Sequence, residues 1–339
     1  MEKRATIRDV AERAKVSKTT VSYVLNDVKK VSEDTRKRVL EAMAELHYEP
    51  DFTAISLTKR KSQLIGVIMP LVNESIAAVM QENTYFNEMI SAIEKVAREN
   101  GFDILLTGLA EPERYRAWVQ KRHLDGLLFL GLFPEEIYSE MRSMDVPAIL
   151  IDTYETHTGD YPSVNVDDEK GGYEAARHLL ALGHKQTAFL TSNRADPVER
   201  ERYKGFQRAY KEAAVKLPPP VETASVHSFE SGYAAGRKIL EEERFTAVSA
   251  GSDTTALGIV RAVHDAGKEV PGDLSVTGFD DIRMSRYLTP ALTTVRQHIE
   301  RKGMIAAKKL VHVINGGQEK AEMIDIELVV RDSTGPAPG

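Results

Sequence analysis

Residues 6–46 read TIRDVAERAKVSKTTVSYVLNDVKKVSEDTRKRVLEAMAEL, and this stretch decides the fold of the N-terminal part of the chain. Its first apolar residues recur at the i, i+3, i+4, i+7 spacing of one helix face: Ile7, Val10, Ala11 and Ala14. Thr6 is a candidate N-cap for this helix, with Asp9 at the capping-box spacing. Ser17 and Ser32 are candidate caps of a second and a third helix. Two helices separated by a short turn and followed by a third indicate a helix-turn-helix module.

The outward face of the second predicted helix carries donors and acceptors that suit phosphate oxygens and base edges in a DNA major groove. These residues are Lys18, Thr19, Ser22, Tyr23 and Asn26. The alternative is a small three-helix bundle whose polar face is only solvated, because helix-pair patterns of this length also arise by chance.

The charge distribution favours DNA binding for this segment. The whole chain of 339 residues has a net charge of −6, but residues 1–62 carry +4 and the remainder carries −10. A small basic segment joined to a larger acidic body is typical of a DNA-binding module fused to another domain.

Composition excludes several classes of protein. The chain has no cysteine, which excludes a disulfide scaffold, a thiolate zinc site and a cysteine nucleophile, and which fits a reducing compartment. No apolar run approaches the ~18 residues of a membrane span, and the N-terminus has no apolar signal region. We therefore expect a cytoplasmic protein without a membrane partner.

Motifs of common enzymes do not occur in the sequence. It contains no GxxxxGK[ST], no GxGxxG after a strand, no GxSxG and no HExxH. The histidines are scattered without metal-ligand spacing. These observations predict a binding protein, and we expect no enzyme activity, no metal and no cofactor.

From Leu64 onward apolar strands alternate with amphipathic helices, which predicts an α/β fold of doubly wound parallel sheets. The predicted strands are Leu64–Leu71, Asp103–Thr107, Gly126–Leu130, Ala148–Asp152, Ser163–Val166, Thr187–Thr191, Ala224–Val226, Ala247–Ala250, Leu274–Gly278 and Leu292–Arg296, with a later one at Ile324–Val330. Because these strands are more numerous than one sheet usually holds, we expect two lobes, with the break between them near Thr158–Pro162.

Three segments of the N-terminal part of the chain, which we call the head, resemble the lactose/galactose-repressor family. Their spacing matches that family without gaps, and they are Thr6–Ala11, Val16–Asn26 and Val31–Arg36. The resemblance continues through the rest of the chain, at Val164–Asp167, Leu182–His184, Gly205–Phe206, Ser275–Asp281, Leu292–Val295 and Val330–Thr334. It implies a periplasmic-binding-protein-like body of two lobes joined by three crossovers.

The resemblance also implies the domain boundaries. Residues 1–49 would form the helix-turn-helix head, 50–62 the hinge, and 63–339 the effector-binding body. The N-lobe would take about residues 63–160 and 294–320, and the C-lobe about residues 161–293 and 321–334.

By the same resemblance, Lys18, Thr19 and Tyr23 read bases, and neighbouring polar residues position the head. The full DNA-contacting set is Thr6, Ser17, Lys18, Thr19, Thr20, Ser22, Tyr23, Asn26 and, as a minor-groove wedge in the hinge, Leu57. Composition alone would make the hinge an ordinary linker with a basic tail.

Ligands of doubly wound lobes lie beyond the carboxyl ends of the strands, where Asp152, Ser252 and Asp280 stand. The resemblance adds Tyr85, Phe86, Arg202 and His227 to this candidate effector site. Carboxylates and a guanidinium in one cleft suit vicinal hydroxyls, which favours a sugar or glycoside. Asp280 and Arg202 could instead form a structural ion pair, and Tyr85 and Phe86 could belong to the core.

The sequence thus predicts a homodimeric, allosteric repressor of carbohydrate genes that binds a pseudo-palindromic operator and a small effector. One alternative within the same fold is control by a corepressor protein or a nucleobase. An alternative from another class is a plain sugar-binding protein, against which the basic residues 1–62 argue.

Overall fold

A computed structural model describes residues 5–25, 28, 30–48, 62–70, 80, 84–108, 112–154, 161–192 and 196–338. The chain divides into two compact units, which are described separately: Met1–Leu64 with Val119–Asp125, and Ile65–Trp118 with Gly126–Gly339. The predicted DNA contacts Asn26 and Leu57, and nearly all of the predicted hinge, lie outside the described residues.

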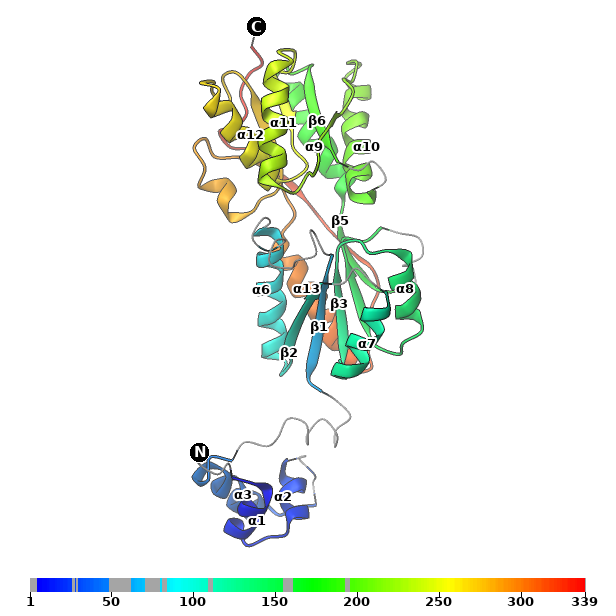
Figure 1. Cartoon of the computed structure of the whole chain (residues 1–339), viewed down its shortest axis with the longest axis vertical. Coiled ribbons are helices and arrows are strands. Elements are labelled where there is room, and N and C mark those ends of the chain that lie inside the picture. Colours follow the sequence, from blue (N-terminus) through cyan, green and yellow to red (C-terminus); the bar gives the residue numbers. More distant parts are fainter. Residues whose placement is uncertain are drawn as a thin grey trace. The chain divides into compact units, whose positions relative to one another are not determined.

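The head contains the three predicted helices, α1 (Ile7–Ala14), α2 (Lys18–Leu25) and α3 (Glu33–Glu45) (Figure 1). Their N-terminal residues act as predicted. The Thr6 amide and hydroxyl both donate to the Asp9 carboxylate at 2.7 Å, and the Ser17 hydroxyl accepts from the Thr20 amide at 3.1 Å. One fully buried valine from each helix meets in the core: Val10, Val21 and Val39. The predicted helix-turn-helix fold is confirmed.

The N-lobe is a six-stranded sheet with the order β11-β5-β4-β3-β1-β2. Its strands are β1 (Leu64–Met69), β2 (Asp103–Gly108), β3 (Gly126–Leu130), β4 (Ala148–Ile151), β5 (Ser163–Val166) and β11 (Glu322–Ile324). The pairs β1–β3, β3–β4, β4–β5 and β5–β11 are parallel. Helices α6 (Thr84–Glu99) and α13 (Ile299–Ile314) pack together beside this sheet, and α7 (Pro112–Arg122) and α8 (Glu135–Arg142) complete the lobe (Figure 1).

The C-lobe has a second six-stranded sheet with the order β12-β10-β9-β8-β6-β7. Its strands are β6 (Thr187–Thr191), β7 (Val221–Glu222), β8 (Ala247–Ser249), β9 (Ser275–Asp280), β10 (Thr293–Arg296) and β12 (Glu327–Val329). Strand β12 pairs antiparallel with β10, and the pairs β9–β10, β8–β9, β6–β8 and β6–β7 are parallel. Helices α9 (Asp168–Ala181) and α10 (Pro197–Glu212) pack as one pair, α11 (Phe229–Glu241) and α12 (Asp253–Asp265) as another, and a short 3₁₀ helix, η2 (Arg283–Arg286), follows β9.

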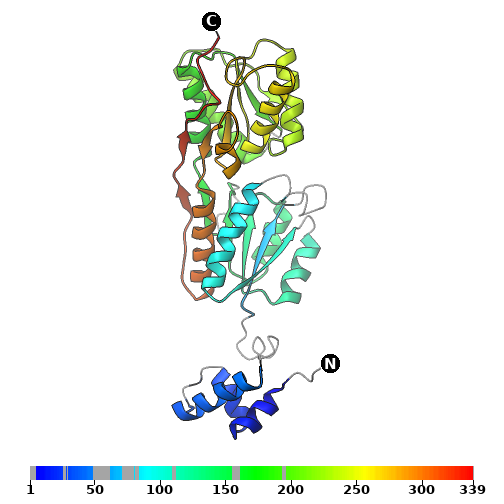
Figure 2. The same cartoon turned by 90° about the vertical axis from the view of Figure 1, so that its left-hand side faces the viewer.

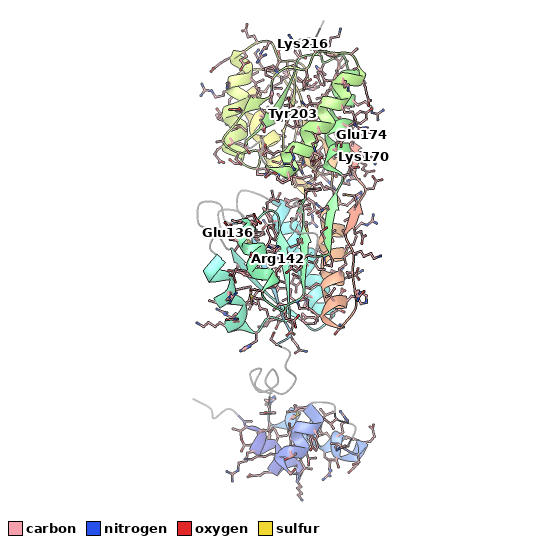
Figure 3. All side chains as sticks on the ribbon, turned by 90° about the vertical axis from the view of Figure 1, so that its right-hand side faces the viewer. Glu136, Arg142, Lys170, Glu174, Tyr203 and Lys216 are labelled. Atoms are coloured by element: carbon pink, nitrogen blue, oxygen red, sulfur yellow. The ribbon has the colours of Figure 1, made fainter. Side chains whose placement is uncertain are left out.

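The chain crosses between the lobes three times, at Asp167, at Gln297–His298 and at Asp325–Ile326 (Figure 2). These positions correct the predicted lobe boundaries. Residues 163–166 and 322–324 belong to the N-lobe sheet, and residues 294–296 belong to the C-lobe sheet. Lys170 on α9, labelled in Figure 3, donates to the Asp325 carboxylate at 2.5 Å and so ties the C-lobe to the third crossover.

Two of the predicted strands differ from the structure. The strand predicted at Ala224–Val226 is wrong, because the pairing strand there is β7, at Val221–Glu222. The strand predicted at Ile324–Val330 is two strands, β11 and β12, separated by the third crossover. No helix in the described ranges is long and apolar enough to cross a membrane.

Candidate functional site

The predicted base-reading residues share one side of α2. Lys18, Thr19 and Tyr23 are exposed, and Tyr23 keeps 40% of its surface although it is a large aromatic residue. Positions 18 and 22, like 19 and 23, are one helical turn apart, so their side chains neighbour each other. Thr20 and Ser22 are half-buried, and Thr6 and Ser17 are exposed caps. This arrangement fits a major-groove helix, and contact of each residue with DNA stays a prediction.

A cavity of about 290 Å³ lies in the body, with lining residues from both lobes and from the second crossover. The lining includes six of the seven predicted effector residues: Tyr85, Phe86, Asp152, Arg202, His227 and Asp280. It also includes Pro70, Gly131, Leu132, Asp196, Val198, Ser225 and Gln297. The predicted strand-end residues Asp152 and Asp280 therefore line the same cavity, one from each lobe.

Arg202 is a buried member of this site with partners that the sequence did not indicate. Its Nε donates to Asp168 Oδ1 at 2.7 Å and its Nη1 donates to the Gly251 carbonyl at 2.6 Å. The guanidinium also lies 3.6 Å from the centre of the Phe279 ring. The predicted alternative of an Arg202–Asp280 ion pair is thus replaced by an Arg202–Asp168 pair with both side chains buried.

Asp168 is held in place by a second donor, the Tyr154 hydroxyl, whose oxygen also lies 2.6 Å from the Val166 carbonyl oxygen. Burial raises the pKa of Asp168, and Arg202 is the largest influence that opposes this rise. The guanidinium therefore favours the ionised form of this buried carboxyl group.

Asp152 lies at the centre of a hydrogen-bonded cluster on the N-lobe side. It accepts from the Tyr85 hydroxyl and, at 2.6 Å, from Lys302 Nζ on α13. Lys302 also donates to Gln297 Oε1 at 2.7 Å, and Gln297 Nε2 donates to Asp280 Oδ1. This chain of contacts joins the carboxylates of the two lobes.

Asp280 occupies an unusual backbone conformation at the end of β9, with φ of +124°, and Asp281 follows with φ of +56°. Such conformations favour glycine and occur where the surrounding structure holds them. Asp281 is held by Arg296 at 2.6 Å and by Arg331 at 2.5 Å. Burial and the neighbouring Asp253 carboxylate raise the pKa of Asp280 well above its ordinary value.

Asp253 is a fully buried neighbour of Asp280 and holds the segment that follows β9. Its carboxylate accepts from the Ile282 amide at 3.0 Å and from the hydroxyls of Ser285 and Thr294. Burial raises the pKa of Asp253 to about 7, although the hydrogen bonds oppose the rise. Both carboxyl groups are buried, and of the two it is Asp280 that lines the cavity.

Ser252 is the one predicted effector residue that the structure places outside the cavity lining. Its side chain is fully buried at the start of α12. The hydroxyl donates to the Val226 carbonyl at 2.6 Å and accepts from the Thr255 amide at 3.2 Å. A serine directly before a helix satisfies the free amides of the first turn, and this role takes the place of ligand contact here.

The remaining candidates divide between wall and core. Tyr85 lines the cavity, yet it is only 8% exposed and packs in the N-lobe core. It therefore belongs both to the cavity wall and to the core. His227 lines the cavity and keeps an exposed side chain. Within the described ranges, no group of three or more His, Cys, Asp or Glu side chains could hold a metal ion.

Sequence reasoning missed Gln297, Lys302, Asp168 and Asp196. Gln297 directly follows β10 and could have been found by the rule that located Asp152 and Asp280 after their strands. Lys302 gives no such signal, since a lysine within a helix is usually a surface residue.

Two family models match the chain. Residues 6–51 match "Bacterial regulatory proteins, lacI family", and residues 176–334 match "Periplasmic binding protein-like domain". The HTH-type transcriptional repressor PurR of Edwardsiella ictaluri (strain 93-146) is 35% identical, and that of Klebsiella pneumoniae (strain 342) is 34% identical. Each match covers 98% of both proteins.

Solved structures of regulators have the same fold. The lac repressor dimer bound to operator and the anti-inducer ONPF is 28% identical, with a TM-score of 0.84 over 98% of this chain and 100% of that one. A complex of the transcriptional regulator CelR with cellobiose is 25% identical, with a TM-score of 0.72 over 97% and 100%. A regulator from Enterococcus faecium with bound ribose is 27% identical, with a TM-score of 0.72 over 81% and 100%.

Proposed function

The chain belongs to the lacI family of bacterial regulatory proteins and is a DNA-binding transcriptional repressor, and we propose that a carbohydrate bound in the cleft between its lobes controls it. It is not an enzyme. A repressor acts where the genome lies, and so we place it in the cytoplasm.

The observation that carries the carbohydrate proposal is the convergence of polar groups from both lobes on one small cavity. Three carboxylates, of Asp152, Asp196 and Asp280, line it together with Arg202 and Gln297. Carboxylates accept hydrogen bonds from neighbouring hydroxyls, and a guanidinium donates in a fixed fork, which is a good match for a polyhydroxylated ligand. The cellobiose and ribose complexes of similar regulators support this choice.

A planar heterocycle such as a nucleobase is the second candidate. The observation that favours it is the presence of Phe86 and His227 in the cavity lining. Rings of this kind can stack on a flat ligand. A sugar also presents an apolar face to an aromatic ring, so the aromatic residues alone do not decide between the two classes.

Control of the head by the cleft requires a coupling free energy between two sites. A ligand that contacts both lobes favours one angle between them, and we propose that this angle sets whether two heads of a homodimer can bind a pseudo-palindromic operator together. The similarity to the lac repressor dimer bound to its operator supports this arrangement.

A thermal-shift screen of the full chain separates the two ligand classes. The panel contains ribose, glucose, galactose and cellobiose on one side and adenine, guanine and hypoxanthine on the other. A ligand at 100 times its dissociation constant adds about 2.7 kcal/mol to the free energy of unfolding. We expect a sugar to raise the melting temperature, and Asp280→Gly to abolish that rise. A rise with bases and none with sugars would refute the carbohydrate proposal.

A further inference from the structure

We propose that Lys302, which does not itself line the cleft, sets the hydrogen-bond polarity of the effector site. It fixes which end of Gln297 faces Asp280, and it leaves Tyr85 and Asp152 on the N-lobe wall able to offer a ligand acceptors only, so that this wall selects ligands that donate. The inference rests on the proposed control by a ligand in the cleft and adds which chemical groups that wall reads.

Lys302 is a fully buried lysine on α13 and is not among the residues that line the cavity. Its ammonium group has three protons and makes three contacts, to Asp152 Oδ1 at 2.6 Å, Gln297 Oε1 at 2.7 Å and the Tyr85 hydroxyl at 3.1 Å. An ammonium group can donate but cannot accept. Each of the three contacted atoms must therefore be an acceptor.

The first consequence concerns Gln297. The side-chain atom that faces Lys302 has to be the carbonyl oxygen, and so the amide nitrogen is on the other side, where it donates to Asp280 Oδ1. A glutamine amide without such a neighbour can be turned over, because its two ends have nearly the same shape. Lys302 thus fixes which end of Gln297 meets the C-lobe carboxylate.

The second consequence concerns Tyr85 and Asp152. Because the Tyr85 oxygen accepts from Lys302, its single proton goes to Asp152 Oδ2. The hydroxyl then has no proton left for a ligand. Asp152 has one donor on each oxygen and keeps unused lone pairs, so it can offer a ligand acceptors but no proton. At Tyr85 and Asp152 a ligand hydroxyl therefore finds an acceptor, and a bare carbonyl or ring nitrogen finds no donor.

A purely structural role explains the position of Lys302 poorly. The side chain lies on the buried face of α13 among apolar residues, which are Ile299, Ala306, Ala307 and Leu310. Apolar residues of similar volume in place of a buried ion pair are often neutral or stabilising. A charge at this site therefore fits a role in specificity, and it joins Asp152 of the N-lobe to Asp280 of the C-lobe through the second crossover.

The same helix offers a matched control. Lys309 is also a mostly buried lysine, with 12% of its side chain exposed, and it pairs with Glu319 at 2.9 Å and Glu322 at 3.0 Å. Neither Lys309 nor its partners line the cavity. Lys309→Gln removes a comparable charge from α13 without touching the effector site.

The test compares the full chain with Lys302→Gln, Lys302→Met and Lys309→Gln. The probes are the sugar of the panel that binds (ribose, glucose, galactose or cellobiose) and its monodeoxy and deoxyfluoro derivatives, which have lost one donor. For at least one hydroxyl position of the sugar, we expect the deoxy and the deoxyfluoro derivative both to bind ten- to a hundredfold more weakly than the parent sugar. This holds for the wild type and for Lys309→Gln. That loss corresponds to the ~1.5–3 kcal/mol of a hydrogen bond to a charged group.

In Lys302→Gln we expect this discrimination to fall below threefold, since the Tyr85 proton is no longer forced onto Asp152 and can turn to a ligand, and Gln297 can turn over. Full discrimination in a folded Lys302→Gln or Lys302→Met protein would overturn the proposal. If a base of the panel binds in place of sugars, the carbohydrate proposal fails, and the base with its N-methylated derivatives then tests Lys302 in the same way.

A measurement without ligand completes the test. The ammonium protons of a lysine with three internal hydrogen bonds exchange slowly with water, and we expect a protected ammonium signal in nitrogen-edited NMR spectra of the wild type that Lys302→Gln lacks. Absence of that signal from the wild type would overturn the proposal whether or not a ligand is known.

Discussion

Replacement of Arg202 by methionine should destabilise the body strongly, because it leaves the Asp168 carboxylate buried without its cation. The two side chains are 8% and 1% exposed, and their contact is 2.7 Å. Removal of one partner from a buried pair of this kind costs about 3–5 kcal/mol, most of which is the cost of the remaining unpaired charge. The same change also removes the hydrogen bond to the Gly251 carbonyl.

The cost should depend on pH in a direction that identifies its cause. Burial already raises the pKa of Asp168, and Arg202 is the largest opposing influence. Without Arg202 the folded state holds a proton on Asp168 well above pH 3.9, the ordinary value at which the unfolded chain releases it. Stability of Arg202→Met should therefore fall as pH rises from about 4 through the raised pKa, which makes the loss larger at pH 8 than at pH 5.

Urea unfolding of the full chain, followed by circular dichroism at pH 5 and pH 8, measures both quantities. The double variant Arg202→Met with Asp168→Asn is the control, since it removes the unpaired charge and keeps an acceptor for Tyr154. We expect the double variant to be more stable than Arg202→Met alone at pH 8. A loss below about 1 kcal/mol, or equal losses at both pH values, would refute the role assigned to the pair.

Three further results are expected. Burial raises the pKa of Asp253 to about 7, so the folded state keeps a proton that the unfolded chain releases near pH 3.9, and the free energy of unfolding should fall as pH rises from about 4 to 7. Asp253→Asn should flatten that fall in urea titrations, and an unchanged slope would contradict the assignment. The buried His184 ring is hydrogen-bonded to the Thr246 hydroxyl and the Gly335 carbonyl at 2.9 Å each. His184→Ala should therefore lower the free energy of unfolding by about 2 kcal/mol and speed amide hydrogen exchange at residues 333–337. Unaltered exchange would show that the ring does not hold this segment. Lys18→Ala should alter the base preference found by selection from random DNA, and an identical consensus sequence would exclude Lys18 from base reading.

Local patterns were sufficient to predict most strands and the carboxylates at their ends. Strand limits such as Gly126–Leu130 and Thr187–Thr191 follow from runs of apolar residues, which a short window contains in full. Asp152 and Asp280 follow from the general position of ligands in doubly wound lobes. The Thr6 and Ser17 caps likewise depend on residues three positions away.

Features that depend on distant residues were not predictable in this way. Residues 163–166 read as a strand, but membership of the N-lobe sheet is decided by pairing with β4 and with β11, which lies more than 150 residues later. Ser252 satisfies the strand-end rule, and its hydroxyl is nevertheless used by α12 and Val226. Lys302 looks like a surface lysine until the fold brings Asp152 to it across 150 positions of sequence.

We propose that occupancy of the cleft changes the affinity of the head for DNA. The direct measurement is fluorescence anisotropy of a labelled operator, obtained by selection from random DNA, titrated with the full chain with and without the sugar found in the panel. Asp280→Gly is the control, because the backbone at φ +124° tolerates glycine while the carboxylate is lost. Coupling between two sites is typically about 1–3 kcal/mol, and so we expect operator affinity to change about 5- to 150-fold in the wild type and to stay constant in the variant. If calorimetry in the same buffer shows that the sugar is bound and operator affinity does not change, control of the head by the cleft is contradicted.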